Sequence, residues 1–98
     1  MLFIVHTRDR QGALELRMAN REAHLQWLKD AGESVKAAGP WLDGSDKPAG
    51  SLLIVEMVDR AELDAWLAND PYALAGVFES VESAPFRWVI NPPDGVPL

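Results

Sequence analysis

We predict an α+β domain with the element order β-α-β-β-α-β, the split pattern of ferredoxin-like folds, from three features of the sequence. Short runs rich in β-branched and aromatic residues alternate with segments of helical periodicity, turn residues separate them, and 98 residues suit one domain. This order places both helices on one face of an antiparallel sheet. We expect a single domain over residues 1–91, followed by a loosely packed Pro-rich tail over residues 92–98.

The N-terminal half predicts a strand, a long helix and a weaker strand. Leu2–Thr7 is a β-branched and aromatic run that ends in a polar stretch, as a strand followed by a loop would. We expect one helix over Ala13–Ala31, stopped by Gly32, and a strand over Glu33–Ala38. Turn residues over Asp43–Gly50 then indicate a hairpin connection. The apolar residues that recur at helical spacing are Leu14, Met18, Leu25 and Leu28.

The C-terminal half begins with Ser51–Val58, the clearest strand of the sequence. Asp59 and Glu62 have the spacing of a capping box, which predicts that a second helix begins there. A short helical turn follows Asp70, and Val77–Ile90 is predicted to be extended. The buried stripe of the second helix is expected to contain Leu63, Trp66 and Leu67.

The first and third strands are apolar on both alternating faces. Leu2 and Ile4 oppose Phe3 and Val5, and the strand that begins at Ser51 shows the same pattern. A sheet with one face in water should instead alternate apolar and polar residues. Because the chain is too short for a second covering layer, we predict a homodimer packed sheet against sheet. An apolar ligand groove on the open face is the alternative.

Composition excludes several classes of function. The chain has 9 Lys and Arg against 15 Asp and Glu, a formal net charge of -6 and a pI near 4.7. An acidic chain without a basic cluster argues against nucleic-acid and membrane-surface binding. Cysteine is absent, which excludes disulfides, thiolate catalysis and Cys-ligated metals. No segment has the length of a signal core or a membrane span, so we expect a cytoplasmic protein.

Three basic residues are expected along one ridge of the first helix. Arg17, Arg21 and His24 follow each other at four- and three-residue spacing, beside the apolar stripe. Together they would make an edge that favours anions, and a neutral imidazole is suited to act as a general base. The alternatives are that Arg21 extends over the edge of the core or pairs with a carboxylate, and that His24 is structural.

The other candidate residues have structural explanations as well. Asp70 before Pro71 has the form of a helix N-cap, Tyr72 could be a core or interface aromatic residue, and Ser51 is a possible hydroxyl donor without a nucleophile motif. The spacing of the two histidines gives little support for a metal site. We therefore expect no metal and no organic cofactor.

Several short motifs nevertheless resemble one family in their order and spacing. They are Leu14-Glu15-x-Arg17, Arg21-x-x-His24-Leu25, Ala38-Gly39-Pro40, Gly50-Ser51, Ala65-Trp66, Asp70-Pro71-Tyr72, Ala75-Gly76-Val77 and Pro85-Phe86. With these motifs the chain resembles the YciI-like (YCII-related) family along nearly its full length. The resemblance implies a ferredoxin-like subunit that forms a dimeric α/β barrel. It also implies an active site around a His–Asp pair, which corresponds to His24 and Asp70 here.

These observations support two hypotheses of different classes. The first is a small cofactor-independent lyase, isomerase or dehydrochlorinase-like enzyme in which His24 moves a proton and Asp70 orients its ring. Arg21, and less directly Arg17, Ser51 and Tyr72, would then bind a small anionic or aromatic substrate. One branch of the resembling family dehydrochlorinates chlorinated hydroxyquinols. The alternative is a non-catalytic dimeric module or accessory protein that binds a small molecule.

Overall fold

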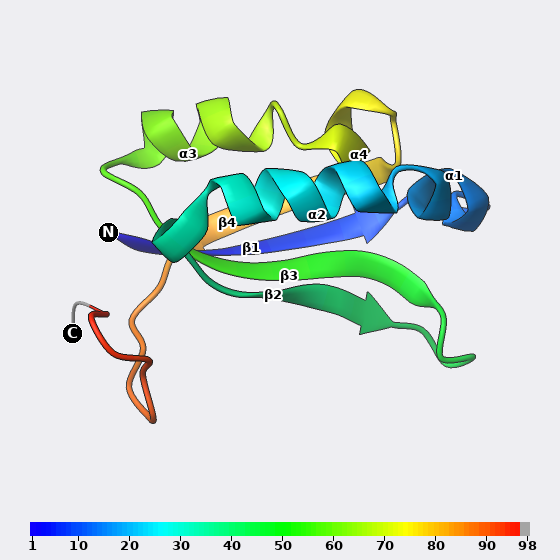
Figure 1. Cartoon of the computed structure of the whole chain (residues 1–98). Coiled ribbons are helices and arrows are strands. Elements are labelled where there is room, and N and C mark those ends of the chain that lie inside the picture. Colours follow the sequence, from blue (N-terminus) through cyan, green and yellow to red (C-terminus); the bar gives the residue numbers. More distant parts are fainter. Residues whose placement is uncertain (97–98) are drawn as a thin grey trace.

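The computed structural model describes residues 1–96 and has two layers, a sheet and the helices that cover one of its faces (Figure 1). The strands are β1 (Leu2–Asp9), β2 (Val35–Leu42), β3 (Pro48–Glu56) and β4 (Phe78–Pro85), and the helices are α1 (Leu14–Ala19), α2 (Arg21–Asp30), α3 (Arg60–Leu67) and α4 (Pro71–Leu74), with a 3-10 turn, η1, at Gly32–Ser34. The sheet is antiparallel, in the order β2-β3-β1-β4. This arrangement confirms the predicted ferredoxin-like α+β fold.

The hydrophobic core lies between the sheet and helices α2 and α3. Its fully buried side chains are Phe3 and Val5 of β1 and Leu53 and Val55 of β3, with Met57 and Leu63 beside them. Trp27, Leu28, Trp66 and Leu67 pack against this cluster from the helices. Burying one such side chain contributes about 1.5–3 kcal/mol to folding. The core therefore holds the helices on the sheet.

The predicted single helix over Ala13–Ala31 is wrong, because the structure has two helices with Asn20 between them. The amide Nδ2 of Asn20 donates to the carbonyl oxygen of Leu16, 2.9 Å away. Asn side chains that bond to the backbone in this way compete with helix propagation. The break changes which residues face the sheet: Arg17 is 4% exposed, whereas Met18, expected in the buried stripe, is 54% exposed.

The remaining elements differ from the predictions mainly at their ends. β2 continues through Pro40, which the sheet tolerates because β2 is an edge strand. β4 ends at Pro85, so the predicted extended segment to Ile90 is only partly a strand. The capping residue of α3 is confirmed, since Asp59 Oδ1 accepts a hydrogen bond from the backbone N–H of Glu62 at 2.9 Å.

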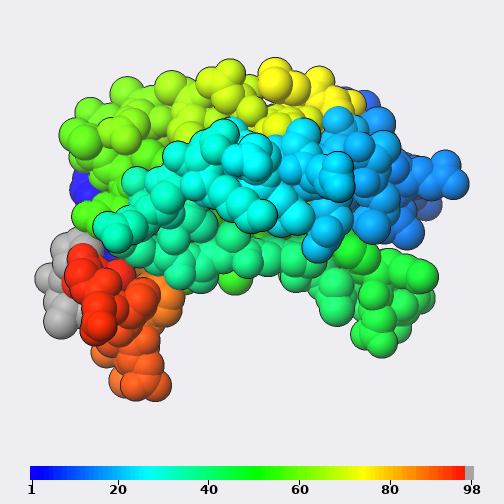
Figure 2. All heavy atoms as spheres, viewed as in Figure 1, coloured from blue at the N-terminus to red at the C-terminus, as the bar shows by residue number. Residues whose placement is uncertain are grey.

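The face of the sheet turned away from the helices is called the open face here. It carries Ile4 and His6 of β1 and Leu52 and Ile54 of β3, paired across the two strands. Two segments project on this side of the molecule, the β2–β3 hairpin and the chain that follows β4, and Figure 2 shows a hollow between them. The last two residues of the predicted tail, 97–98, lie outside the described part of the chain.

Candidate functional site

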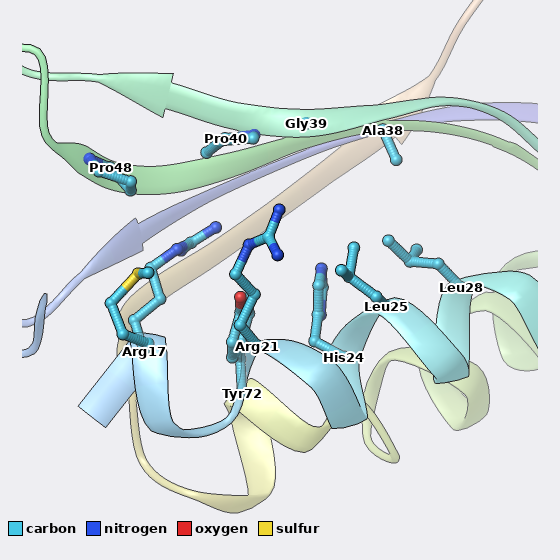
Figure 3. Close-up of a pocket in the computed structure, with 11 residues that line it drawn as sticks. Arg17, Arg21, His24, Leu25, Leu28, Ala38, Gly39, Pro40, Pro48 and Tyr72 are labelled. Atoms are coloured by element: carbon cyan, nitrogen blue, oxygen red, sulfur yellow. The ribbon is translucent and has the colours of Figure 1, made fainter. Parts of the chain in front are cut away.

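A pocket of ≈ 230 Å³ lies between α2 and the edge strand β2 (Figure 3). It is lined by Arg17, Met18, Arg21, His24, Leu25, Leu28, Ala38, Gly39, Pro40, Pro48 and Tyr72. One part of the lining is basic and aromatic, and the part formed by Leu25 and Leu28 is apolar. A small ring with an acidic substituent would complement both parts of this lining.

His24 and Asp70 form a buried pair at this pocket. His24 lies in the first half of α2, and Asp70 is the N-cap residue of α4, followed by Pro71 at the first helical position. The Nδ1 atom of His24 lies 2.8 Å from Oδ1 of Asp70. The side chains are 7% and 3% exposed, respectively. The N-cap position of Asp70 in α4 brings its carboxylate against α2.

The hydrogen bonds of Asp70 define the form of the imidazole. Its Oδ1 atom also accepts the backbone N–H of Tyr72, at 2.9 Å. An ionised carboxylate only accepts hydrogen bonds, so Nδ1 of His24 must be the donor in this pair. In the neutral ring the lone pair then resides on Nε2. Figure 3 shows the ring extending from α2 into the space below the sheet, where Nε2 can act as a base.

Tyr72 packs against two basic groups of the site. Its ring is stacked on that of His24, with centroids 3.9 Å apart and planes inclined by 14°. The Cζ atom of Arg17 lies 4.5 Å from the Tyr72 centroid. Burial raises the pKa of the Tyr72 phenol, and the charges of Arg17 and Arg21 act against this increase. Tyr72 is therefore an aromatic wall of the pocket and fixes the plane of the imidazole.

Arg17 is held by hydrogen bonds to protein partners. Nη1 donates to both carboxylate oxygens of Asp9 at 3.0 Å, and Nη2 donates to Oγ of Ser51 at 2.8 Å. The backbone N–H of Ser51 in turn donates to Oγ1 of Thr7 at 2.8 Å. Burial raises the pKa of the Asp9 carboxyl above its ordinary value, and Arg17 opposes this effect. This network holds Arg17 rigidly and uses much of its hydrogen-bonding capacity.

Ser51 occupies its position because of the residue before it. A Cβ atom on Gly50 would collide with the carbonyl oxygen of Thr7 and with the indole of Trp41. The Trp41 Nε1–H donates to that same carbonyl oxygen at 2.7 Å. Only glycine leaves room for this close approach, and it sets the strand register at which Ser51 reaches Arg17.

Arg21 differs from Arg17 in having an exposed guanidinium group, which Figure 3 shows directed toward β2 and Pro40. Within residues 1–96 it makes no ion pair. The sequence alternative in which a carboxylate neutralises Arg21 therefore has no support among these residues. Arg21 is the cation that a ligand in the pocket can reach.

The structure thus brings most predicted site residues together. Arg17, Arg21, His24 and Tyr72 line the pocket, and Asp70 lies behind His24. Ser51 is not among the described lining residues, so its role as a substrate ligand stays a prediction. Sequence reasoning missed Asp9, although alternation from Val5 through Thr7 would have placed Asp9 on the buried face.

The described residues give no support for a metal site or for a membrane-spanning helix. Within residues 1–96 there is no cluster of three or more His, Cys, Asp or Glu side chains that could hold a metal ion. No helix in that part of the chain combines the length and the apolar character needed to cross a membrane.

The sequence pattern of the YCII-related domain matches residues 1–87. The chain belongs to the YCII-related family. The protein YciI of Escherichia coli is 37% identical over 97 residues, which cover 91% of this chain and 99% of that relative. An uncharacterised protein of Haemophilus influenzae is 33% identical over the same coverage.

Solved structures agree with membership of the YCII-related family. The 5-chloro-2-hydroxyhydroquinone dehydrochlorinase of Burkholderia phenoliruptrix, in complex with 2,5-dihydroxybenzoquinone, has a TM-score of 0.85 and 30% identity. The match covers 89% of this chain and 94% of the dehydrochlorinase. An antibiotic biosynthesis monooxygenase has a TM-score of 0.57 at 18% identity, covers 91% and 99% of the two chains, and shows the shared fold alone.

Proposed function

We propose that this protein is a small lyase or isomerase that moves a proton with His24 while Asp70 orients the imidazole. The observation that carries the proposal is the 2.8 Å contact between His24 Nδ1 and Asp70 Oδ1 at the wall of a pocket. This contact leaves Nε2 as the basic atom. Positioned general bases contribute about 10²–10⁴-fold to rate. We further propose that the enzyme acts as a homodimer through its open face.

The lining of the pocket favours a small planar substrate with an acidic hydroxyl group. The Arg21 guanidinium would stabilise the negative charge that develops on oxygen when the proton leaves. Leu25 and Leu28 offer apolar contacts to a ring, and Tyr72 offers an aromatic face. A volume of ≈ 230 Å³ suits a single substituted ring better than a large ligand.

Dehydrochlorination is the specific reaction class that the structural neighbour suggests. The name of that neighbour gives its substrate as 5-chloro-2-hydroxyhydroquinone, and dehydrochlorination is the net loss of HCl. His24 would accept the proton of one hydroxyl group and deliver it to the carbon that bears chlorine, which becomes tetrahedral. Loss of a second hydroxyl proton to His24 would then expel chloride and leave a hydroxyquinone. The net loss of HCl needs neither an oxidant nor a reductant. An isomerase would use the same base to return the proton at another position.

The test is turnover of 5-chloro-2-hydroxyhydroquinone, followed by chloride release and by the ultraviolet spectrum. We expect His24→Gln to lower kcat/KM by about 100-fold or more. Asp70→Asn should displace the pH profile, because the imidazole loses its charged partner. Gln26→Ala, on the exposed side of the same helix, is the control and should retain activity. Unchanged turnover in His24→Gln would refute the mechanism.

A non-catalytic binding module is the second candidate function. It is favoured by the double use of Asp70 Oδ1, which bonds both His24 and the N–H of Tyr72 as a purely structural cap would. This candidate predicts saturable binding of 2,5-dihydroxybenzoquinone without any product. It also predicts that His24→Gln lowers the Tm markedly. The enzyme hypothesis predicts that turnover decreases far more than stability or binding.

A further inference from the structure

The hydroxyl group of Tyr72 is a polar group that the packing of its ring does not account for. Tyr72 is 2% exposed, because its ring is stacked on His24 and covered by Arg17. Its backbone N–H donates to Asp70, but within residues 1–96 its phenolic oxygen, Oη, makes no hydrogen bond. A buried tyrosine hydroxyl normally has a hydrogen-bond partner. A ligand is the partner that the described residues do not supply.

The Tyr72 oxygen opens into the pocket and is not sealed in the core. Among the described residues, the fully buried side-chain nitrogen and oxygen atoms that lack a partner reduce to one atom, Nε1 of Trp27. The unpartnered Oη of Tyr72 is therefore part of the small exposed fraction of that residue. Tyr72 lines the pocket between α2 and β2, and Figure 3 shows its oxygen directed toward the sheet. The hydroxyl thus faces the space that a ligand would fill.

The stacking of the two rings brings this hydroxyl close to the base. The rings of Tyr72 and His24 have centroids 3.9 Å apart and planes inclined by 14°. Nδ1 of His24 is turned to Asp70, so Nε2 is the ring nitrogen that remains for a ligand. In Figure 3 the outer nitrogen of the imidazole and the phenolic oxygen lie on the same side of the stack, toward β2. One oxygen atom of a small ligand can therefore lie within reach of both groups.

The charges around the hydroxyl favour an anionic acceptor. Burial raises the pKa of the Tyr72 phenol, so the group is protonated at neutral pH and can donate. The positive charges of Arg17 and Arg21 act at the same point. The neighbouring carboxylates, Asp9 and Asp70, already form short contacts with basic side chains. A ligand oxygen beside Tyr72 therefore meets an O–H donor and an excess of positive charge.

We propose that the Tyr72 hydroxyl donates a hydrogen bond to an ionised ring oxygen of the ligand, and that it selects ligands that carry such an oxygen. The proposal rests on the pocket of the proposed function and names the group that recognises the acidic hydroxyl. When His24 accepts the proton of that hydroxyl, the negative charge left on oxygen is stabilised by the Tyr72 O–H and by Arg21. The phenolic proton stays on Tyr72, so the contact consumes no acid.

The same contact explains how the pocket would discriminate between ligands. A ligand that covers the Tyr72 hydroxyl without accepting its hydrogen bond leaves a buried donor unpaired. Sites that hydrogen-bond a substrate hydroxyl reject analogues that lack it more strongly than apolar pockets do. An ionised acceptor increases the difference, because charge-assisted hydrogen bonds are the stronger ones. We therefore expect a preference for an acidic ring hydroxyl over its methyl ether.

The experiment compares the affinities of the full chain for 2,5-dihydroxybenzoquinone and for 2,5-dimethoxybenzoquinone, in which methyl groups replace both acidic protons. Isothermal titration calorimetry gives the Kd of each ligand. Tyr72→Phe removes the hydroxyl and keeps the ring that stacks on His24. Ser45→Ala removes a hydroxyl from the exposed turn between β2 and β3 and is the matched control. We expect the preference for the dihydroxy compound to decrease at least about tenfold in Tyr72→Phe and to stay unchanged in the control.

The outcomes separate this contact from the proposed reaction. An undiminished preference in Tyr72→Phe, or an equal decrease in Ser45→Ala, overturns the role of the hydroxyl and leaves the His24 mechanism standing, because chloride release tests that mechanism independently. A wild-type chain without any preference for the dihydroxy compound overturns both the contact and the anionic substrate of the proposed function. A preference that depends on Tyr72 supports the contact even if no chloride is released.

A measurement on the wild-type chain covers the case in which circular dichroism shows that Tyr72→Phe does not fold. Tyr72 is the single tyrosine, so a ¹³C label at Cζ of tyrosine reports on this residue alone. Its NMR resonance should move toward the tyrosinate value when 2,5-dihydroxybenzoquinone binds, and much less with the dimethoxy compound. A resonance that responds equally to both ligands, or to neither, overturns the proposal.

Discussion

Two halves of the helix-covered sheet face are equally buried but chemically opposite. Along β1 the side chains that face the helices change from Phe3 and Val5 to Thr7 and Asp9. β3 changes in the same way, from Val55 and Leu53 to Ser51 as it approaches the same end. The apolar half packs against α3 and the second half of α2. The polar half encloses Arg17 and adjoins the pocket.

The apolar half contributes mainly to stability, and the polar half contributes mainly to the geometry of the site. Apolar burial is the main favourable contribution to folding. A buried ion pair such as Asp9–Arg17 contributes little net stability, because desolvation offsets the attraction between the charges. Replacing only one of the two residues lowers the stability strongly, however, because the other charge is then buried without a partner. We infer that the polar half is present because it fixes the orientation of Arg17 and of the residues around it.

The largest expected effect comes from breaking the polar half. Asp9→Ala leaves the Arg17 guanidinium buried without its carboxylate, and we expect a loss of about 3–5 kcal/mol in the free energy of unfolding. Urea denaturation measures this loss. The double variant Asp9→Ala/Arg17→Met removes both charges and should recover much of the stability. A single variant as stable as wild type would show that the pair is not buried in solution.

Truncating a side chain in the apolar half should lower the stability by a similar or slightly smaller amount. It should leave the ligand affinity of the pocket unchanged. Leu53 is 1% exposed, so Leu53→Ala should cost about 2–5 kcal/mol through lost burial and a cavity. Binding of 2,5-dihydroxybenzoquinone per folded molecule should be preserved, which calorimetry can measure. A large loss of affinity in folded Leu53→Ala would show that the two halves are not independent.

Replacing the exposed arginine should reverse this pattern. Arg21→Gln removes a charge that makes no ion pair within residues 1–96, so the free energy of unfolding should change by less than about 0.5 kcal/mol. The affinity for the same quinone should decrease about tenfold, because hydrogen bonds to charged groups are worth about 1.5–3 kcal/mol. Lys29→Gln removes the same charge from the exposed side of α2 and is the control. Equal affinities in the two variants would contradict a role for Arg21 in binding.

The smallest effect concerns the titration of Tyr72, the single tyrosine of the chain. Because burial raises the pKa of this phenol above 10.0, its tyrosinate absorbance at 295 nm should develop at higher pH in the folded protein than in urea. The unfolded chain then loses this proton first, so stability should decrease as pH rises from about 10 through the folded pKa. A midpoint at or below 10.0 in the folded state would show that the ring is solvated.

The strands could be predicted from the sequence because their apolar runs are short and bounded by turn residues. The N-cap at Asp59 was equally predictable, since a capping interaction is local in sequence. The helix break at Asn20 was not, because a single Asn is compatible with a helix interior unless its side chain bonds to the backbone. That break decides which side chains face the sheet, so it also explains the misplacement of Met18.

The site was predictable only in part. His24 and Asp70 are 46 residues apart, and nothing in their local patterns indicates contact; the resemblance to a family supplied that expectation. Asp9 was overlooked because it lies in a run of polar residues typical of a loop. Its ion pair depends on β1 extending two residues beyond the predicted end, which pairing with β4 makes possible. Long-range pairing of this kind is not encoded in any short segment.

The shared oxygen of Asp70 means that the proton between Asp70 and the His24 ring is positioned during folding rather than by a ligand. The same atom ends the loop before α4 and selects the ring nitrogen of His24 that carries hydrogen. A mutation that loosens this single turn would therefore also change the basicity of the His24 ring, even if the mutated residue contacts neither His24 nor the pocket. The pocket lining could change more easily at Arg21 and along β2, where side chains can be replaced without disturbing that proton.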